Sequence, residues 1–186
     1  MINTIPHHFY SIIDPPNKKD LLFLLESTNL STDNTPHWVK HCNIKFERVE
    51  INQELWDTLY PSLDIFFKEV NLDIQNLKLG INDIWKNTYE EGFFQEVHDH
   101  LPLHLSGVIF LTDEQEDDGK FFFYNEGYTE VSREWRDLNF SGERKFIRSE
   151  RGKLLLFPSY MLHGVSVHKS DNIRKSVSFN LVFNID

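Results

Sequence analysis

The sequence predicts a mainly β protein with flanking helices: a jelly roll, or double-stranded β-helix, preceded by two support helices. Three observations lead to this fold class. Two early segments carry apolar residues at helical spacing, short strand-like segments then follow one another, and the 186-residue chain holds 16 Phe and 4 Trp. Large rings are common where two sheets pack face to face. We expect one domain over residues 1–186, with helical support at about 17–70 and the β core at about 75–186.

The two support helices are expected at residues 18–27 and 52–70. The first carries four leucines at helical spacing and follows the turn Asp14-Pro15-Pro16-Asn17. The second carries many aliphatic and aromatic residues, and Pro61 inside it is expected to kink or restart the helix. Residues 38–51, between the two helices, are expected to be extended.

The β core is expected to consist of short strands. Each segment is rich in apolar or aromatic residues, and glycines separate many of them. Short strands without helices between them are typical of a sandwich or a small barrel. The segments are residues 77–89, 93–100, 105–111, 120–124, 153–157, 164–168 and 174–184.

Composition and charge exclude several classes of protein. The net charge of −10 argues against general nucleic-acid binding, because phosphate backbones are bound by clustered Lys and Arg. Basic residues gather between Arg133 and Lys153, and we interpret them as solvated surface. Cys42 is the only cysteine, which excludes an intrachain disulfide and a thiolate metal site. No apolar run approaches the ~20 residues of a membrane span, and residues 1–10 lack a secretory pattern, so we expect a cytoplasmic protein.

Three histidines of the β core form a candidate metal site. His98 and His100 are separated by one residue, so on a strand both point to the same face, whereas Asp99 points to the other. Neutral imidazole is the commonest metal ligand, and two on one face can hold one ion. The candidate for a third ligand is His163, which follows a buried-type strand and a turn at Pro158. The remaining histidines are assigned no metal role, and His168 is expected at the surface beside a turn.

Arg174 and Ser176 form a candidate carboxylate site. Both side chains share one face of the last predicted strand, which follows the strand that begins with His163. A guanidinium forms bidentate charge-assisted bonds with a carboxylate, and a nearby hydroxyl adds one donor. An arginine on a strand is more often part of a surface ion pair. The position next to a metal histidine favours the carboxylate site.

The order of these motifs resembles that of the iron(II)- and 2-oxoglutarate-dependent oxygenases, in particular small members from bacteria and from phages of marine bacteria. The resemblance covers most of the chain and is weak between residues 30 and 75. If a phage encodes the protein, the host cytoplasm is its expected place. The matching segments are Trp85-Lys86-Asn87, His98-Asp99-His100, Ser106-Gly107-Val108, Phe157-Pro158, His163 and residues 174–180.

The resemblance implies an oxidoreductase that uses O2 and couples 2-oxoglutarate decarboxylation to the oxidation of a substrate. It implies that Arg174, helped by Ser176, holds the distal carboxylate of 2-oxoglutarate. Asn87 or Tyr89 would support the other end of this cosubstrate. No catalytic residue is expected beyond the metal ligands. The substrate is open, either a small molecule or a protein side chain, and residues 124–151 form a long insertion in which a substrate groove could lie.

The resemblance also implies that His98 and His163 are ligands of iron(II). Relatives usually carry a carboxylate where this chain has His100, which indicates a three-histidine site. Asp99 has the wrong strand parity to replace it, while Glu96 has the right parity but precedes His98. The other candidates for the third ligand are therefore Glu96, Asp99 and His104.

Two other functions remain open. Residues 92–104 and 152–163 are similar to the two cupin motifs, which would make the chain a metal-binding cupin, an isomerase or a dioxygenase that does not use 2-oxoglutarate. His104 would then be a metal ligand. The pair of Arg174 and Ser176 argues against this alternative, because a cupin does not need it. A non-enzymatic jelly-roll module is the third reading, and it predicts no bound metal.

Overall fold

The computed structural model describes residues 8–27, 30–31, 44–138 and 142–185, and both predicted helices are present: α1 at Lys18–Ser27 and α2 at Gln53–Glu69. The side chain of Asn52 caps α2 by accepting a hydrogen bond from the Leu55 amide at 2.9 Å, which satisfies one of the donors that a helix start leaves free. The expected restart at Pro61 does not occur, since α2 continues past it. Burial of one apolar face along the whole helix outweighs the lost backbone hydrogen bond.

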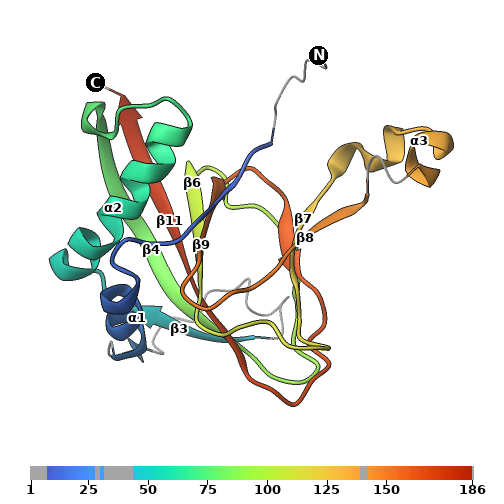
Figure 1. The fold of residues 1–186 in the computed structure, drawn as a ribbon, viewed down its shortest axis with the longest axis horizontal. Helices are drawn as coiled ribbons and strands as arrows, with labels where there is room; N and C mark the ends of the chain where they lie inside the picture. The colour runs from blue at the N-terminus through green and yellow to red at the C-terminus, as the bar shows by residue number, and fades with distance from the viewer. Residues whose placement is uncertain (1–7, 28–29, 32–43, 139–141, 186) are drawn as a thin grey trace.

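Two antiparallel sheets form the β core and confirm the predicted double-stranded β-helix (Figure 1). The larger sheet has the order β1 (Ser11–Ile13), β9 (Leu154–Pro158), β6 (Leu105–Phe110), β11 (Arg174–Ile185), β4 (Leu77–Tyr89), β3 (Lys45–Val49) and β2 (Leu30–Ser31). The smaller sheet has the order β5 (Gln95–His98), β10 (His163–Val165), β7 (Phe121–Tyr124) and β8 (Arg144–Ile147).

The central strand β11 separates an apolar core from a polar interior. Val177 and Phe179 point outward and share one hydrophobic cluster with Leu25 of α1 and Phe67 of α2, which lie on the outer face of the larger sheet (Figure 1). Gly107 lies opposite Phe179 in register, where a Cβ would overlap the ring. The alternate residues of β11 face the space between the sheets. They are Arg174, Ser176, Ser178 and Asn180.

Aromatic rings also line the space between the sheets. Phe121 and Phe123 of β7 pack there against Phe157 of β9, with ring centroids 5.8 and 5.0 Å apart. Tyr89 and Phe110 belong to the same buried cluster. This inner cluster confirms the expectation, drawn from the phenylalanine content, that large rings fill the gap between packed sheets.

The insertion between β7 and β8 contains helical structure that the sequence did not indicate. A 3-10 helix, η3 (Glu126–Glu130), and a short helix, α3 (Arg133–Asp137), precede β8, and α3 projects away from the sheets (Figure 1). The strands β1, β2 and β8 were also not predicted. Of the segment expected to be extended, the structure contains β3, while residues 38–43 lie outside the described residues.

The expectation that His168 lies at the surface is wrong, because the residue is fully buried. Its Nδ1 atom accepts a hydrogen bond from the Gly119 amide at 2.9 Å, and its Nε2 atom donates to the Asn172 carbonyl at 2.6 Å. Asp118 lies 3.8 Å from Nδ1. The ring therefore ties together the two loops that precede β7 and β11, a contact between distant segments that local composition does not reveal.

The basic residues between Arg133 and Lys153 do not form one positive patch. Arg151 pairs with Glu26 at 2.6 Å, and Lys153 lies 3.6 Å from Asp14. Arg144 stacks over the Phe122 ring at 4.5 Å. Their partners lie on different elements, in agreement with a solvated surface. Among the described residues no helix is long and apolar enough to cross a membrane.

Candidate functional site

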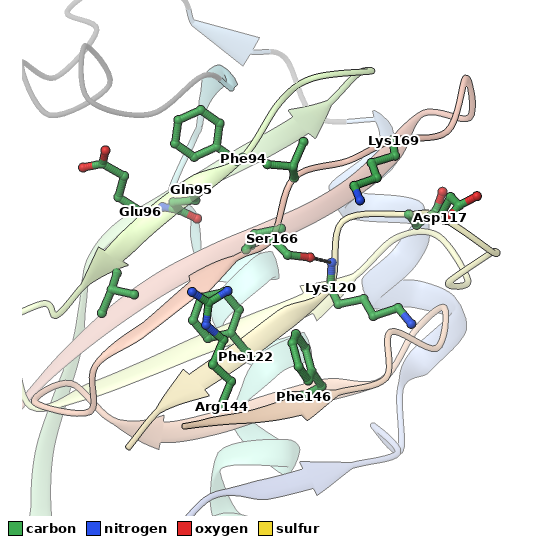
Figure 2. Close-up of a pocket in the computed structure, with 14 residues that line it drawn as sticks. Phe94, Gln95, Glu96, Asp117, Lys120, Phe122, Arg144, Phe146, Ser166 and Lys169 are labelled. Carbon is green, nitrogen blue, oxygen red and sulfur yellow. Dashed lines mark hydrogen bonds between the residues drawn. The ribbon is translucent and has the colours of Figure 1, made fainter. Parts of the chain in front are cut away.

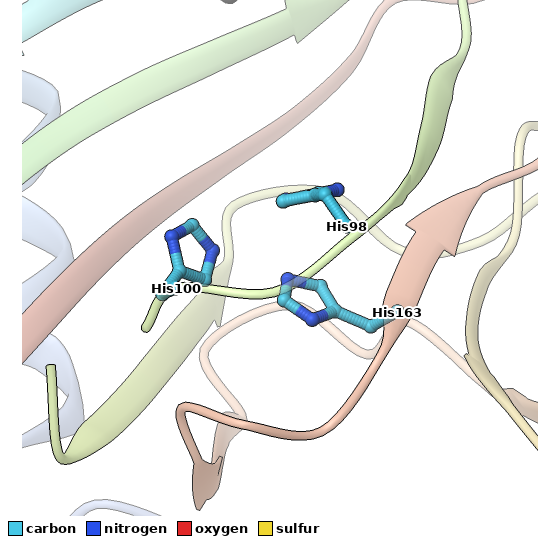
Figure 3. Close-up of side chains that lie close together, drawn as sticks. All are labelled: His98, His100 and His163. Carbon is cyan, nitrogen blue, oxygen red and sulfur yellow. The ribbon is translucent and has the colours of Figure 1, made fainter. Parts of the chain in front are cut away.

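The pairing of β5 with β10 brings the three predicted histidines together. His98 lies opposite His163 in register, and His100 follows β5 by two residues. The ring centroids of His98 and His163 are 4.4 Å apart, and each lies 5.0 Å from that of His100. One ligand atom from each ring lies within 4.8 Å of the others (Figure 3). This geometry allows three imidazoles to hold one metal ion.

Two of the three rings are oriented by backbone carbonyls. The Nδ1 atom of His98 lies 2.7 Å from the carbonyl oxygen of Glu96, and that of His163 lies 2.8 Å from the carbonyl oxygen of Met161. A carbonyl oxygen only accepts, so both Nδ1 atoms carry hydrogen. The Nε2 atom of each neutral ring then keeps the lone pair that a metal needs.

His100 is held differently. Its Nδ1 atom lies 3.4 Å from the amide nitrogen of Asn180 on β11. The Asn180 Oδ1 atom already accepts from the Ser106 hydroxyl at 2.8 Å, which leaves the amide nitrogen facing the ring. The lone pair of Nδ1 is therefore engaged by a donor, so His100 lacks the arrangement that prepares His98 and His163.

His163 is buried, and His98 and His100 are partly buried, which favours the neutral form of the rings. Burial lowers the pKa of His163 well below its ordinary value and also lowers that of His98. For His100, burial and then the neighbouring His98 lower the pKa to about 3. The ring of Phe157 packs 4.8 Å from that of His163, and the ring of Phe121 stacks on the His163 ring with the centroids 5.5 Å apart. The cluster thus offers unprotonated nitrogens in apolar surroundings.

The acidic candidates for a third ligand do not join the histidines. β5 contains a bulge: His163 pairs with His98, whereas Val165, two residues on, pairs with Gln95, three residues back. The extra residue turns Glu96 to the exposed outer face of the smaller sheet, where it lines a surface hollow (Figure 2). The parity argument for Glu96 therefore fails. The Asp99 carboxylate accepts a hydrogen bond from the Leu101 amide at 3.0 Å.

The same bulge brings Gln95 into the interior, which the sequence did not predict. Its amide nitrogen lies 3.3 Å from the Nε2 atom of His98, and its amide oxygen, Oε1, accepts a hydrogen bond from the Tyr89 hydroxyl at 3.0 Å. On a regular strand Gln95 and His98 would face opposite sides, because they are three residues apart. Nothing in the sequence marks the bulge.

At the other end of the interior lies a buried cation. Arg174 is 2% exposed, and its guanidinium stacks 4.7 Å from the centre of the Tyr89 ring. Nη2 lies 3.5 Å from the Ser149 hydroxyl, whereas Nε and Nη1 have no hydrogen-bond partner among the described residues. Burial lowers the pKa of Arg174, but a guanidinium remains charged at neutral pH. Buried donors of this kind require an acceptor, which makes Arg174 a candidate anion site.

Both ends line the same pocket. The three histidines, Arg174, Ser176 and Tyr89 all contribute to its walls. Asn87 is buried nearby, but its amide nitrogen donates to the Ser178 hydroxyl at 3.0 Å, and it is not among the pocket residues. A larger hollow on the outer face of the smaller sheet contains none of the three histidines (Figure 2).

His104 lies apart from the histidine cluster. Its Nδ1 atom accepts a hydrogen bond from the Phe183 amide at 2.9 Å, and its ring packs 4.8 Å from the Phe183 ring. The group of potential metal ligands found in the described residues consists of His98, His100 and His163 alone. The four-ligand arrangement of the cupin alternative is therefore not formed.

Comparison with known proteins agrees with this geometry. A family model described as “Putative 2OG-Fe(II) oxygenase” matches residues 83–180, which is more than half of the 186-residue chain. The match begins in β4 and ends at Asn180 in β11, so it includes all three histidines and Arg174. No curated protein matches the sequence.

Several solved structures share the fold. A 2OG-Fe(II) oxygenase family oxidoreductase from Burkholderia pseudomallei has a TM-score of 0.63 and 13% identity, over 89% of this chain and 77% of that one. HygX from Streptomyces hygroscopicus, crystallised with nickel, 2-oxoglutarate and hygromycin B, has a TM-score of 0.60 and 12% identity, over 93% and 82%. A prolyl-4-hydroxylase from Pseudomonas putida has a TM-score of 0.59 and 15% identity, over 95% and 93%.

The matched segment, the double-stranded β-helix and the pocket between its sheets all indicate the same family. The cofactors of the matching family are iron(II) and 2-oxoglutarate. The chain belongs to the 2-oxoglutarate- and iron(II)-dependent oxygenases, which are oxidoreductases.

Proposed function

We propose that His98, His100 and His163 hold the iron(II) and that Arg174 and Ser176 hold the distal carboxylate of 2-oxoglutarate. One observation carries this proposal: three neutral imidazoles and a buried guanidinium with two unpaired nitrogens line a single pocket. Each group is suited to one of the two cofactors, and the pocket joins them.

The donor set at the histidine end fits iron(II). Imidazole nitrogen is a common ligand of iron, and the carbonyl contacts of His98 and His163 leave both Nε2 lone pairs available. His100 occupies the position where a carboxylate is usual. It becomes a ligand when the contact between its Nδ1 atom and the Asn180 amide nitrogen is broken. The three rings bring no negative charge, so the charge of the ion is compensated only when an anion binds beside it.

The arginine end fits a carboxylate. The unpaired Nε and Nη1 atoms of Arg174 supply two donors, and the buried hydroxyl of Ser176 lies on the same strand face. Tyr89 lines the pocket beside Arg174, whereas the amide of Asn87 is engaged by Ser178. We therefore assign the supporting role to Tyr89 in preference to Asn87.

When bound, iron(II) and 2-oxoglutarate supply the oxidising chemistry: O2 gives one oxygen atom to succinate as CO2 is lost, and the other to the substrate. The chain supplies the surroundings. Phe121 and Phe157 exclude water from the histidine side of the pocket. Arg174 fixes one end of the cosubstrate, so that its other end is directed toward the histidines.

The substrate is proposed by class: a small molecule or a protein side chain. HygX was crystallised with hygromycin B, and the P. putida relative is a prolyl-4-hydroxylase, so the fold serves both classes. A hollow lined by Tyr10, Phe123 and Lys145 lies beside Met161, whose carbonyl orients His163. We propose this hollow as the approach for the substrate, because it is the cavity next to the loop that leads into His163.

The proposal is tested by loading the purified chain with iron(II) and measuring the succinate formed from 2-oxoglutarate. We expect bound iron and O2-dependent succinate, and we expect His98→Ala to abolish both. Arg174→Ala is expected to retain iron while losing succinate formation at low 2-oxoglutarate. Iron bound equally well by His98→Ala would overturn the assignment of the metal site.

A further inference from the structure

A continuous chain of side chains connects the two ends of the pocket through Gln95. Gln95 is 8% exposed and lies between Tyr89 and His98. The guanidinium of Arg174 in turn stacks on the ring of Tyr89. All four residues line the pocket. Gln95 therefore contacts both His98 and Tyr89, on whose ring the Arg174 guanidinium is stacked.

The direction of each hydrogen bond in this chain is fixed by a single backbone carbonyl. The Glu96 carbonyl accepts, so Nδ1 of His98 carries hydrogen and Nε2 of the neutral ring must accept. The group facing Nε2 at 3.3 Å is the Gln95 amide nitrogen, which can only donate. Gln95 Oε1 is then free to accept from the Tyr89 hydroxyl at 3.0 Å. Both polar atoms of the Gln95 side chain thus have a hydrogen-bond partner.

The Gln95 donor thus occupies the lone pair of His98 that a metal would use. When the metal takes this lone pair, the amide nitrogen loses its acceptor inside a buried pocket. Tyr89 still holds Oε1, so the amide does not swing out to water. A buried donor without a partner is unfavourable. A carboxylate or keto oxygen bound beside the metal is an acceptor that could take up this donor.

We propose that Gln95 is a positioning residue that couples the two binding events, so that it opposes binding of the metal alone and favours binding of the metal together with the 2-oxo acid. This inference rests on the proposed function. By linkage, the factor by which the 2-oxo acid raises the affinity for the metal equals the factor by which the metal raises the affinity for the 2-oxo acid, so a change at Gln95 alters both enhancements equally. The three neutral rings act in the same direction, because they too leave the metal charge to be balanced by the anion.

A purely structural glutamine predicts the opposite sign. If Gln95 only supported the fold of the pocket, its removal would weaken metal binding with and without the 2-oxo acid, as the loss of an outer hydrogen bond to a ligand usually does. If it couples the two sites, its removal strengthens binding of the metal alone and reduces the enhancement that the 2-oxo acid produces. The sign of the change therefore separates the two roles.

The experiment is calorimetric titration of Ni²⁺, which avoids turnover, into the full metal-free chain with and without saturating 2-oxoglutarate. For Gln95→Leu we expect Ni²⁺ alone to bind about two- to tenfold more tightly, as the loss of one competing hydrogen bond implies. We expect the enhancement by 2-oxoglutarate to fall by at least the same factor. Tyr89→Phe, which keeps the ring but removes the anchor of Oε1, should change both values in the same direction and by less.

Controls separate this inference from the function on which it rests. Gln75→Leu, at an exposed glutamine of the 3-10 helix η2 (Ile74–Asn76), should leave both titrations unchanged. His98→Ala should abolish Ni²⁺ binding; if it does not, the proposed metal site is wrong. If His98→Ala behaves as expected while Gln95→Leu weakens Ni²⁺ in both titrations or alters neither, only the coupling role is overturned. Should Gln95→Leu fail to fold by circular dichroism, Tyr89→Phe decides the matter by the same two signs.

Discussion

The two ends of the pocket differ in how completely the chain satisfies them. At the histidine end, every Nδ1 atom of the three rings has a polar neighbour between 2.7 and 3.4 Å away. At the arginine end, two guanidinium nitrogens have no partner among the described residues. One end is uncharged, and backbone carbonyls orient two of its three rings; the other end is charged and has unpaired donors. In the proposed function, an ion of charge +2 binds at the first end and a carboxylate of 2-oxoglutarate at the second, and both ends line one pocket.

The three histidines proposed as ligands are held in two different ways. His98 and His163 are oriented by carbonyls of the smaller sheet, whereas His100 is held by Asn180 of the larger sheet. The two carbonyl contacts lie within two residues of their histidines in sequence, so they form with the local backbone. The contact of His100 spans 80 residues and depends on how the sheets are packed. Removing a member of either kind tests whether this distinction matters for binding.

The largest effect is expected from His163→Ala. The variant loses one of two rings already oriented for a metal, so iron(II) affinity should fall by more than the ~10- to 100-fold typical of residues behind the ligands. Metal analysis after dialysis measures the loss, and circular dichroism verifies the β fold. The matched control is His168→Ala, at a buried histidine outside the cluster. It should lower thermal stability yet leave the affinity for iron(II) in the folded protein unchanged.

At the opposite end, Arg174→Ala should impair the cosubstrate and spare the metal. Loss of a hydrogen bond to a charged group costs about 1.5–3 kcal/mol, which corresponds to a roughly 10- to 150-fold weaker binding of 2-oxoglutarate. Calorimetric titration of the metal-loaded protein gives this value. Arg174→Lys keeps the charge without the planar fork and should lie between the two. An unchanged affinity for 2-oxoglutarate would show that Arg174 does not bind the carboxylate. The proposed difference between the two ends of the pocket would then be wrong.

The acid stability of the metal-free protein should depend on His100. The pKa of His100 in the folded protein, about 3, lies below the ordinary value of 6.5. Between these pH values the unfolded chain therefore binds a proton at His100 that the folded protein does not bind. The resulting stability is present above pH ~6.5 and is lost as the pH falls toward 3, by at most ~1.4 kcal/mol per pH unit. His100→Gln removes this titrating group. Urea unfolding at several pH values should give a shallower decline for the variant; parallel declines would exclude a depressed pKa at His100.

The sequence predicts much of this site because its main rules are local. Strand alternation predicts that His98 and His100 share one face and that Arg174 and Ser176 share one face. In the structure the histidines do lie together, although His100 follows the end of β5, and Arg174 and Ser176 line the same pocket. The bulge in β5 breaks the rule between Gln95 and His98, so Gln95 was missed and Glu96 was given the wrong face. A bulge depends on the pairing with β10, which no local pattern specifies.

Similar reasons account for the errors in the fold. β8 begins with Arg144 and Lys145, whose charges conceal a strand, and β1 has only three residues. Both become strands because a neighbouring strand offers hydrogen bonds, from β7 in one case and β9 in the other. The helix α2 passes through Pro61 because its packing against the sheet outweighs a local preference. In each case contacts from distant parts of the chain decide the result.

The smallest effect on the metal is expected from His104→Ala, and its small size is informative. His104 is four residues from His100, and a cupin would use it as a ligand. Its exposed ring instead accepts from the Phe183 amide at 2.9 Å. Substitution should therefore leave iron content and 2-oxoglutarate affinity at their parental values. Loss of the hydrogen bond should lower the free energy of unfolding by about 1 kcal/mol, which denaturant unfolding measures. If His104→Ala instead loses iron as His163→Ala does, the metal end extends beyond the three rings, and the contrast between an uncharged, closed set of ligands and an open cationic end no longer holds.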